Sequence, residues 1–483
     1  MKNKVLLINL PSDSIRKPEE HCGLAFLKAY LELNNVDTDI LDAYAKRKDI
    51  EYCKNYISLW IKKNSDCNKY IGISPFVTSY EYFIELGKYI KQHFNNCKVF
   101  AGGHFATLNK EYVLDNNLWL DAIIVGEGEV SLFEYVRTIS DTNIDGVYQR
   151  KFKKQYKPRE RIINLDELPF QSRYLSTDEL EGQPFAITTS RGCYGECSFC
   201  SISSFYKTNT IEIKQTFRSA KSVSEEIHNL VKKYKINSIK IVDDNFFRTQ
   251  SNDFLEQLIE FLLDIKISIR VSARPNDITE KRAELLEKLG VTVVAIGAES
   301  AHKESLKLFN KGIEIESSDN AIRFLDDNNI TCLVNFIMFN PIIDIDGIED
   351  NCNFIERHIE DCLFHRINSH LWIRSTDPIV ETLVLMGLCK KKGFPYIECK
   401  YQSREVVEIR KYFDMWCESN MEEYYKYADV LMAKGIRDNE DIYNKYKTLL
   451  KKDIEVLKEI VEFSRRGILS KVGEQYIQTL LNE

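Results

Sequence analysis

Apolar residues follow two different patterns over the first 140 residues of the chain. Short apolar runs of strand length occur at 5–10, 37–41, 70–74, 98–101 and 121–125. Longer segments carry their apolar residues on one helical face, at 22–33, 80–94 and 129–138. Strands that alternate with helices pair in parallel, so this region is predicted to form a doubly wound, flavodoxin-like sheet. Ligands of such sheets bind beyond the carboxyl ends of the strands.

A second alternating series begins near residue 185. Its apolar runs lie at 186–189, 238–242, 268–272, 292–296, 332–339 and 367–373. The capping-box sequence Ser222-Val223-Ser224-Glu225 signals the first helix between them, and further helical patterns lie at 252–265, 279–289, 316–327 and 348–361. Six strands with helices between them predict a partial (β/α)6 barrel, whose active residues sit at the carboxyl ends of the strands.

Two other regions lack this alternation. The segment 141–184 contains Pro158, Pro169 and Pro184 and has no regular period, which indicates a connector. Past Gly393 the chain is rich in Lys, Glu, Tyr and Leu without strand alternation, which indicates helices. We therefore predict an α/β protein with four parts, at 1–140, 141–184, 185–393 and, as a helical carboxyl-terminal region, 394–483.

Charge and hydropathy narrow the classes of partner. The formal net charge of -7 argues against nucleic acid or an anionic membrane as the main partner, because clustered Lys and Arg drive such binding. The amino terminus lacks the pattern of a signal peptide, and the chain lacks the run of about 18 apolar residues that a membrane span needs. We expect a cytoplasmic protein whose scattered cysteines are reduced core or surface residues.

Three cysteines lie within eight residues after the first barrel strand: Cys193, Cys197 and Cys200. Gly192 and Gly195 allow the loop to turn back on itself, so the three thiolates can converge on one metal centre. Iron-sulfur clusters normally take four cysteines, so a cluster held by three keeps one iron open for another ligand. The alternatives are a zinc knuckle, which needs a fourth Cys or His nearby, and a chance group of buried thiols.

The Cys-x3-Cys-x2-Cys spacing, with Phe199 directly before the last cysteine, resembles the cluster loop of the radical SAM enzymes. The resemblance implies that Cys193, Cys197 and Cys200 hold a [4Fe-4S] cluster. In that family S-adenosylmethionine (SAM) chelates the open iron, and its reductive cleavage yields a 5'-deoxyadenosyl radical that abstracts hydrogen from the substrate. Phe199 is expected at the SAM site, and a partial barrel is the core fold of this family.

The barrel strand ends carry polar residues that the resemblance assigns to SAM. It places an acidic pair, Asp243 and Asp244, at the SAM ammonium, where a carboxylate would make a charge-assisted hydrogen bond. It places Arg274 at the SAM carboxylate or ribose, and Glu299 with Ser300 near the ribose and methionine. The alternatives are helix-capping acids for the Asp pair, a surface ion pair for Arg274 and a solvated loop position for Glu299.

The first 140 residues resemble the cobalamin-binding domain that precedes many radical SAM cores. The shared motifs are Gly23-Leu24-Ala25, Gly72-Ile73-Ser74, Gly102-Gly103-His104-Phe105 and Gly126-Glu127-Gly128-Glu129. The resemblance implies cobalamin contacts at Ser74, Gly102, Gly103, His104, Gly126 and Glu127. The Asp-x-His-x-x-Gly motif that supplies a lower cobalt ligand in other cobalamin enzymes is absent, and His21 lies just before a helix. Many relatives bind the corrin without a protein imidazole, whereas others keep the domain as a vestigial support; the alternative for His104 is a solvated loop histidine.

These resemblances lead to one main functional hypothesis and two alternatives. The first is a cobalamin-dependent radical SAM methyltransferase that acts on an unactivated carbon of a natural product or peptide. The second is a radical SAM enzyme without methyl transfer, such as one that dehydrates or rearranges a sugar or peptide, with a vestigial B12 domain. The third, of another class, is a non-catalytic iron-sulfur redox protein. The expected partners are a small-molecule or peptide substrate and an external electron donor such as flavodoxin or ferredoxin.

Overall fold

The computed structural model describes residues 2–12, 18–138, 142–207, 214–248, 251–391, 397–436 and 439–482. The chain forms two compact units, one of Met1–Cys193 with Ser201–Ile236 and one of Tyr194–Cys200 with Asn237–Glu483. The predicted part boundaries near residues 140 and 393 fall outside the described residues. None of the helices in the described ranges combines the length and the apolar character that a membrane span requires.

The first unit is built on a six-stranded sheet in the order β2-β1-β3-β4-β5-β6. Its strands are β1 (Asn3–Asn9), β2 (Asp37–Asp42), β3 (Asn68–Ser74), β4 (Cys97–Ala101), β5 (Ala122–Ile124) and β6 (Val147–Tyr148). All neighbours pair in parallel except β5 and β6, which are antiparallel. Because β1 lies between β2 and β3, the strand order reverses beside β1, and ligands of open α/β sheets bind at such a switch point.

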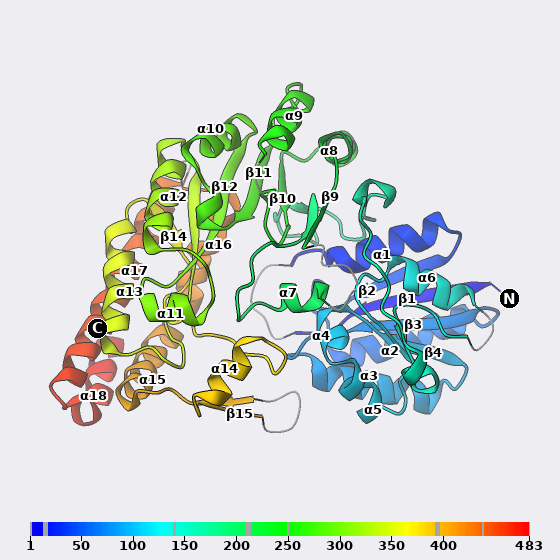
Figure 1. Ribbon diagram of the computed structural model, residues 1–483, viewed down its shortest axis with the longest axis horizontal. Coiled ribbons are helices and arrows are strands. Elements are labelled where there is room, and N and C mark those ends of the chain that lie inside the picture. The colour runs from blue at the N-terminus through cyan, green and yellow to red at the C-terminus, as the bar shows by residue number, and fades with distance from the viewer. Residues whose placement is uncertain are drawn as a thin grey trace. The chain divides into compact units, whose positions relative to one another are not determined.

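Helices cover both faces of this sheet (Figure 1). Helices α1 (Cys22–Leu33) and α6 (Glu129–Arg137) lie on one face, where Leu24 and Leu132 pack into the core with Val5. Helices α2 (Ile50–Lys63) and α3 (Tyr80–His93) lie on the other face, and the short helices α4 (Gly103–Leu108) and α5 (Lys110–Asn116) follow β4. The doubly wound prediction is therefore confirmed, although α2, α4 and α5 were not predicted.

The same unit contains the elements on either side of the cysteine loop. They are η1 (Arg150–Gln155), η2 (Leu165–Glu167), β7 (Phe185–Ile187), β8 (Ser190–Gly192), α7 (Ser201–Tyr206), β9 (Gln215–Phe217) and α8 (Ala220–Tyr234). Strands β8 and β9 form an antiparallel pair. The capping-box prediction at Ser222 is wrong by one turn, because the side chain of Ser219 accepts the hydrogen bond from the Ser222 amide and begins α8.

The second unit contains five parallel strands in the order β14-β13-β12-β11-β10. They are β10 (Ser238–Ile241), β11 (Ser268–Ala273), β12 (Val291–Glu299), β13 (Thr331–Phe336) and β14 (Cys362–Phe364). With β7 the chain has the six strands expected of a partial (β/α)6 barrel. The last predicted strand, 367–373, is wrong. The strand is the three-residue β14 instead, and 367–373 meets Phe339 only through a single bridge at His370.

Helices alternate with these strands and continue to the carboxyl terminus. The alternating ones are α9 (Asp253–Phe261), η3 (Pro275–Asp277), α10 (Glu280–Lys288), α11 (Lys303–Leu308), α12 (Ile315–Asp327) and α13 (Ile345–His358). The terminal ones are α15 (Arg404–Ser419), α16 (Met421–Lys434), α17 (Glu440–Arg465) and α18 (Leu469–Asn482), which confirms the helical carboxyl-terminal region. Helix α16 packs on β12 and β14, and the Tyr424 hydroxyl donates to the Phe364 carbonyl at 2.7 Å.

A small disulfide-bonded hairpin precedes these terminal helices. It follows α14 (Ile379–Leu385) and consists of β15 (Cys389–Lys391) and β16 (Ile397–Cys399). Cys389 and Cys399 lie directly opposite each other in the antiparallel pair and form a disulfide. The expectation that all scattered cysteines are reduced is therefore wrong for these two, because the hairpin register brings their side chains together.

Candidate functional site

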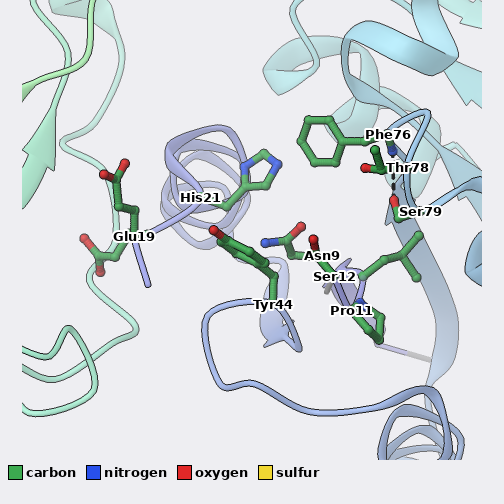
Figure 2. Close-up of a pocket in the computed structure, with 11 residues that line it drawn as sticks. Asn9, Pro11, Ser12, Glu19, His21, Tyr44, Phe76, Thr78 and Ser79 are labelled. Atoms are coloured by element: carbon green, nitrogen blue, oxygen red, sulfur yellow. Dashed lines mark hydrogen bonds between the residues drawn. The ribbon is translucent and has the colours of Figure 1, made fainter. Parts of the chain in front are cut away.

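A pocket of about 350 Å³ lies at the switch point of the first sheet (Figure 2). It is formed where β1 and β3 end and where the chain enters α1, the place at which doubly wound sheets bind ligands. Its lining residues are Asn9, Leu10, Pro11, Ser12, Glu19, Glu20, His21, Tyr44, Phe76, Thr78 and Ser79. Phe76 is half exposed, which leaves an aromatic face available at the rim.

His21 lies at the centre of this pocket and begins α1. Its Nδ1 accepts the backbone N–H of Leu24 at 3.3 Å, which caps the helix. Burial lowers the pKa of His21 against the opposing effect of the Asp42 charge, so the ring is neutral near pH 7. In a neutral ring whose Nδ1 accepts a hydrogen bond, Nε2 carries the proton and has no lone pair for a metal. His21 therefore presents an N–H donor, 3.5 Å from Ser74 Oγ.

A buried hydrogen-bond group fixes the pocket wall behind His21. Asp42, at the end of β2, accepts from Asn9 Nδ2 at 2.8 Å and from the Tyr174 hydroxyl at 2.7 Å. The Tyr174 hydroxyl in turn accepts the backbone N–H of His21 at 2.5 Å. Burial and the Asp42 carboxylate raise the pKa of Tyr174, so it stays a protonated donor. Tyr174 belongs to the predicted connector, which therefore helps to shape the pocket.

None of the six predicted cobalamin residues is among the residues that line this pocket. Ser74 and Gly103 adjoin each other, because a Cβ on Gly103 would lie 3.0 Å from Ser74 Oγ and the glycine has φ +84°. Gly102 lies between β4 and α4 as the N-cap of the helix, and the Gly126 amide donates to Thr107 Oγ1 at 3.0 Å. His104 and Glu127 instead contact other parts of the protein: His104 stacks on Phe205, and Glu127 pairs with Arg191.

The cysteine loop is tied down by the backbone of the second unit. The Ser198 N–H donates to the Phe309 carbonyl at 2.8 Å, its carbonyl accepts from Ile379 at 2.8 Å, and its hydroxyl donates to the Leu308 carbonyl at 2.6 Å. The predicted SAM residue Phe199 packs edge-on against Phe309, with ring centroids 5.3 Å apart. These contacts hold the segment between Cys197 and Cys200 in one conformation.

Two buried cations lie beside Cys197. Arg274 donates from Nη1 to Cys197 Sγ at 3.3 Å and from Nη2 to the Lys311 carbonyl. Burial acts to lower the pKa of Lys311, but the Glu299 carboxylate and Cys197 together outweigh this effect and raise the pKa. Lys311 Nζ lies 2.9 Å from Glu299 Oε1. Positive charge and a hydrogen-bond donor at a sulfur both stabilise a thiolate, which is the form that binds iron.

The chemistry of the loop fits an iron-sulfur cluster. Cys193, Cys197 and Cys200 are all outside disulfides, and three cysteine sulfurs are the donor set of a cluster with one open iron. Across the part of the chain that the structure describes, no three His, Cys, Asp or Glu side chains converge as a metal site without the metal. Cys193 ends the first unit, whereas Cys197 and Cys200 belong to the second.

A hydrogen-bonded chain that the sequence did not reveal supports Arg274. Asp277 accepts from the Tyr194 hydroxyl at 2.8 Å and from Asn245 Nδ2 at 2.9 Å, and Asn245 Oδ1 accepts the Arg274 backbone N–H at 3.2 Å. Burial and Asp277 raise the pKa of Tyr194 to about 12, so it remains a donor. Asn245 directly follows the predicted Asp pair, and its position after β10 is the signal by which it could have been found.

The remaining predicted SAM residues differ in exposure. Asp243 is buried whereas Asp244 is exposed, so only Asp243 points into the protein. Glu299 is buried with a φ of +68°, at a register shift between β12 and β13. Ser300 is fully buried and donates to Asn351 Oδ1 at 2.9 Å. The structure thus brings Cys197, Arg274 and Glu299 together through Lys311, and it uses Ser300 to connect the end of β12 to α13.

Family models match both halves of this architecture. The model of the radical SAM superfamily matches residues 187–355, so the chain contains a radical SAM domain, and its relatives show that it is an enzyme. The model of the B12 binding domain matches residues 13–136, so the chain combines an amino-terminal B12-binding domain with a radical SAM domain, the arrangement of one class of radical SAM enzymes. The cofactors of this class are a [4Fe-4S] cluster, SAM and cobalamin. The alternative of a non-catalytic redox protein is not supported.

Individual relatives agree with these matches. An uncharacterized methyltransferase of Pyrococcus horikoshii is 28% identical over 376 residues, covering 73% of this chain and 78% of the relative. An anaerobic magnesium-protoporphyrin IX monomethyl ester cyclase of Rubrivivax gelatinosus is 28% identical over 336 residues, covering 65% of this chain and 58% of the cyclase. The solved structure of the cobalamin-dependent SAM radical enzyme OxsB, with aqua-cobalamin and SAM bound, has a similar fold, with a TM-score of 0.79 and 18% identity over 98% of this chain and 75% of that chain.

Proposed function

We propose that the protein is a cobalamin-dependent radical SAM methyltransferase that methylates an unactivated carbon of a small molecule or peptide. The observation that carries this proposal is the pocket at the switch point of the first sheet, which lies in the region matched by the B12 model. The hydrogen-bonded group of Asn9, Asp42 and Tyr174 holds the wall of that pocket in place, which supports a binding site more than a vestigial domain. The name of the Pyrococcus horikoshii relative supports methyl transfer.

When bound, the cofactors supply one-electron cleavage of SAM and a transferable methyl group, and the protein positions and shields them. Cys193, Cys197 and Cys200 are proposed to hold the cluster, with Arg274 donating to Cys197 Sγ. Asp243, Glu299 and Phe199 are proposed to face SAM. Ser74, Gly102, Gly103 and Gly126 are proposed to border the corrin, and His21 to donate from Nε2 into the pocket.

His21 is not proposed as a cobalt ligand. Its Nδ1 accepts from Leu24, so its Nε2 carries the proton. The absent Asp-x-His-x-x-Gly motif agrees with this assignment. The optical spectrum of bound cobalamin should therefore lack the features of imidazole coordination, and it should be the same in wild type and in His21→Asn.

Labelled SAM tests the proposal without knowledge of the substrate. Full-length protein is reconstituted anaerobically, supplied with hydroxocobalamin and a reductant, and incubated with SAM labelled in its methyl group. We expect 5'-deoxyadenosine to form and label to be recovered with the extracted corrin. Cleavage of SAM with no label in the corrin, from protein that contains one corrin per chain, would count against methyl transfer.

A second candidate is a radical SAM reaction without methyl transfer. The relative in Rubrivivax gelatinosus is named a cyclase, and it has the same 28% identity to this chain as the named methyltransferase, over a shorter match. In that case the label would stay out of the corrin, although 5'-deoxyadenosine would still form. The two candidates therefore give opposite results in the labelling experiment.

The expected partners remain part of the proposal. A reduced flavodoxin or ferredoxin is proposed as the electron donor, because the cluster must receive an electron from outside the chain. The substrate is proposed to be a natural-product precursor or a peptide. A cytoplasmic site of action stays a prediction based on the lack of a signal-peptide pattern and on the cysteine usage. The absence of nucleic acid and of a membrane as partners stays a prediction based on the net charge of -7 and the lack of a long apolar run.

A further inference from the structure

Two segments of the first unit lie directly on either side of the cysteine loop. Strand β8 ends at Gly192, one residue before Cys193, and α7 begins at Ser201, one residue after Cys200. Whatever holds these two segments also sets where the loop begins and ends. Both segments are held by side chains from the B12-binding region and the connector, including two residues that the sequence assigned to cobalamin.

The segment before the loop is held by the Gly-Glu-Gly-Glu turn. Arg191 in β8 pairs with Glu127 at 3.2 Å and with Glu129 at 2.5 Å, and the three side chains are 13%, 6% and 5% exposed. The second oxygen of Glu127 accepts the Ile162 amide at 2.9 Å. Breaking a buried ion pair from one side leaves an uncompensated charge, so this contact is hard to replace.

The end of β8 is also held close to β9. Gly192 has φ +90°, and a Cβ there would lie 2.1 Å from the Lys214 carbonyl oxygen, so β8 and β9 approach as closely as glycine permits. Arg161 adds two further bonds, to the Arg191 carbonyl and to Thr216 Oγ1 in β9, both at 3.1 Å. Cys193 thus leaves the first unit from a fixed position.

The segment after the loop is held by aromatic stacking. His104, at the start of α4, stacks on Phe205 of α7 with ring centroids 4.0 Å apart and planes 17° apart. The Arg161 guanidinium lies over the Tyr206 ring at 3.9 Å. Arg161 therefore contacts both flanking segments, through the Arg191 carbonyl before the loop and the Tyr206 ring after it.

We propose that Glu127, Glu129 and His104, together with Arg161, hold the two ends of the cysteine loop and are positioning residues for the cluster, not cobalamin contacts. Glu127 and Glu129, which follow β5, form ion pairs with Arg191 of β8. His104, which follows β4, stacks on Phe205 of α7. The order of the cluster loop then depends on the B12-binding domain, even with no cobalamin bound. The inference rests on the proposed cluster site at Cys193, Cys197 and Cys200.

The test separates cluster order from cobalamin binding in the full-length protein. The variants are Glu127→Gln with Glu129→Gln, and the matched control is Glu134→Gln, which removes the ion pair to Arg159 from the same helix α6. Iron per chain, the electron paramagnetic resonance (EPR) spectrum of the reduced cluster with and without SAM, and the Kd for hydroxocobalamin are measured. We expect the SAM-dependent EPR signal to fall at least fivefold while the cobalamin Kd stays within twofold of wild type.

Several outcomes overturn the inference. A cobalamin Kd raised more than tenfold with an intact EPR signal would make the carboxylates cobalamin contacts. Unchanged values for both would show that the pairing does not position the loop. Wild-type protein that takes up no cluster would contradict the proposed cluster site itself, which is a different failure because it precedes any comparison of variants.

A pair of His104 variants decides the question if the double variant does not fold. His104 is exposed at the surface of α4, so changes there disturb the core little. His104→Phe keeps the stacking on Phe205 and should preserve both the EPR signal and cobalamin binding, whereas His104→Ala should weaken only the SAM-dependent EPR signal. Loss of cobalamin affinity in His104→Phe would instead show that the imidazole contacts cobalamin, and an unaltered EPR signal in His104→Ala would show that stacking does not order the loop.

Discussion

The strand ends of the two sheets are organised in different ways. In the second unit the strand-end side chains bond to one another: Asp277 joins Tyr194 to Asn245, Arg274 reaches Cys197, and Glu299 pairs with Lys311. In the first unit the ends of β1 and β3 open into a pocket of about 350 Å³. Apart from the antiparallel pair of β5 and β6, both sheets are built from parallel strands, and both follow the same rule for where ligands bind. The barrel site is thus built before its ligands arrive, whereas the switch-point site keeps open space.

This difference fits two different roles for the two units. A radical needs a rigid, water-excluding site, and the interbonded side chains of the second unit provide that rigidity. A large cofactor that must present its reactive face elsewhere needs space and shape, which the pocket beside His21 and Phe76 provides. The substitutions below disrupt either the bonded side chains of the second unit or the pocket of the first, and they follow in order of decreasing expected effect.

The largest effect is expected from Cys197→Ser. Loss of one of three proposed ligands should prevent stable cluster assembly, so iron content and reductive SAM cleavage should both fall to background. Iron analysis and chromatographic assay of 5'-deoxyadenosine measure this. The control is Cys67→Ser, which changes a partly exposed thiol directly before β3. SAM cleavage that persists at the wild-type rate in Cys197→Ser would show that the cysteine loop does not hold the cluster.

The next effect concerns the ion pair at the end of β12. Lys311→Met leaves Glu299 buried without its cation, and such a change destabilises a protein by roughly 3–5 kcal/mol. Thermal unfolding should show a large loss, most of which Glu299→Gln restores in the double variant. If Lys311→Met were as stable as wild type, the ion pair between Glu299 and Lys311 would not help to hold the barrel site in place without its ligands.

A smaller effect is expected on the cluster potential. Arg274→Gln removes a cationic donor from Cys197 Sγ. Such a donor stabilises the reduced cluster, because reduction adds one negative charge, and it therefore raises the reduction potential. A loss of about 1.4 kcal/mol would lower the midpoint potential by about 60 mV for one electron. Potentiometric titration followed by EPR measures the shift, and Arg323→Gln, at an exposed position of α12, is the control for net charge. An unshifted potential would mean that Arg274 leaves Cys197 once the cluster is bound, as its predicted role at SAM would require.

The smallest effect concerns the pH dependence of the pocket. Because burial lowers the pKa of His21, the folded protein keeps the ring neutral where the unfolded chain protonates it. The stability that His21 contributes is therefore complete above pH 6.5, the ordinary value, and is lost as the pH falls below it. His21→Asn keeps an N-cap acceptor without titrating, so its melting temperature should fall less than that of wild type between pH 7.5 and pH 5.5. Equal losses in both proteins would place the titration elsewhere.

Much of the fold was predictable because its periodicity is strong. The bounds of α1 agree with the predicted 22–33, and β1 to β5 agree with their predicted ranges within two residues, whereas β6 lies in the predicted connector and was missed. Helix α2 was missed although Cys53, Ile57, Trp60 and Ile61 recur at helical spacing, a readable signal among many polar residues. Strand β14 could not be distinguished, because three apolar residues carry no period.

The site was predictable in its residue types but not in its contacts. Arg274 was expected at SAM, yet its guanidinium reaches Cys197, which lies 77 positions away in the sequence. Glu127 was assigned to cobalamin because its motif occurs in that domain, whereas its partner Arg191 lies 64 positions further on. Such pairings depend on how distant segments pack. A motif identifies the residue but does not identify its partner.

The most direct test of the account is an anaerobic structure of the full-length protein with cobalamin and SAM bound. We predict that the corrin borders the pocket at His21 and Phe76, without an imidazole on cobalt. We also predict that Glu127 and Glu129 stay on Arg191 and that Arg274 stays on Cys197. A structure in which Glu127 or Glu129 leaves Arg191 to bond the corrin side chains would contradict the central claim that these strand ends hold the cysteine loop.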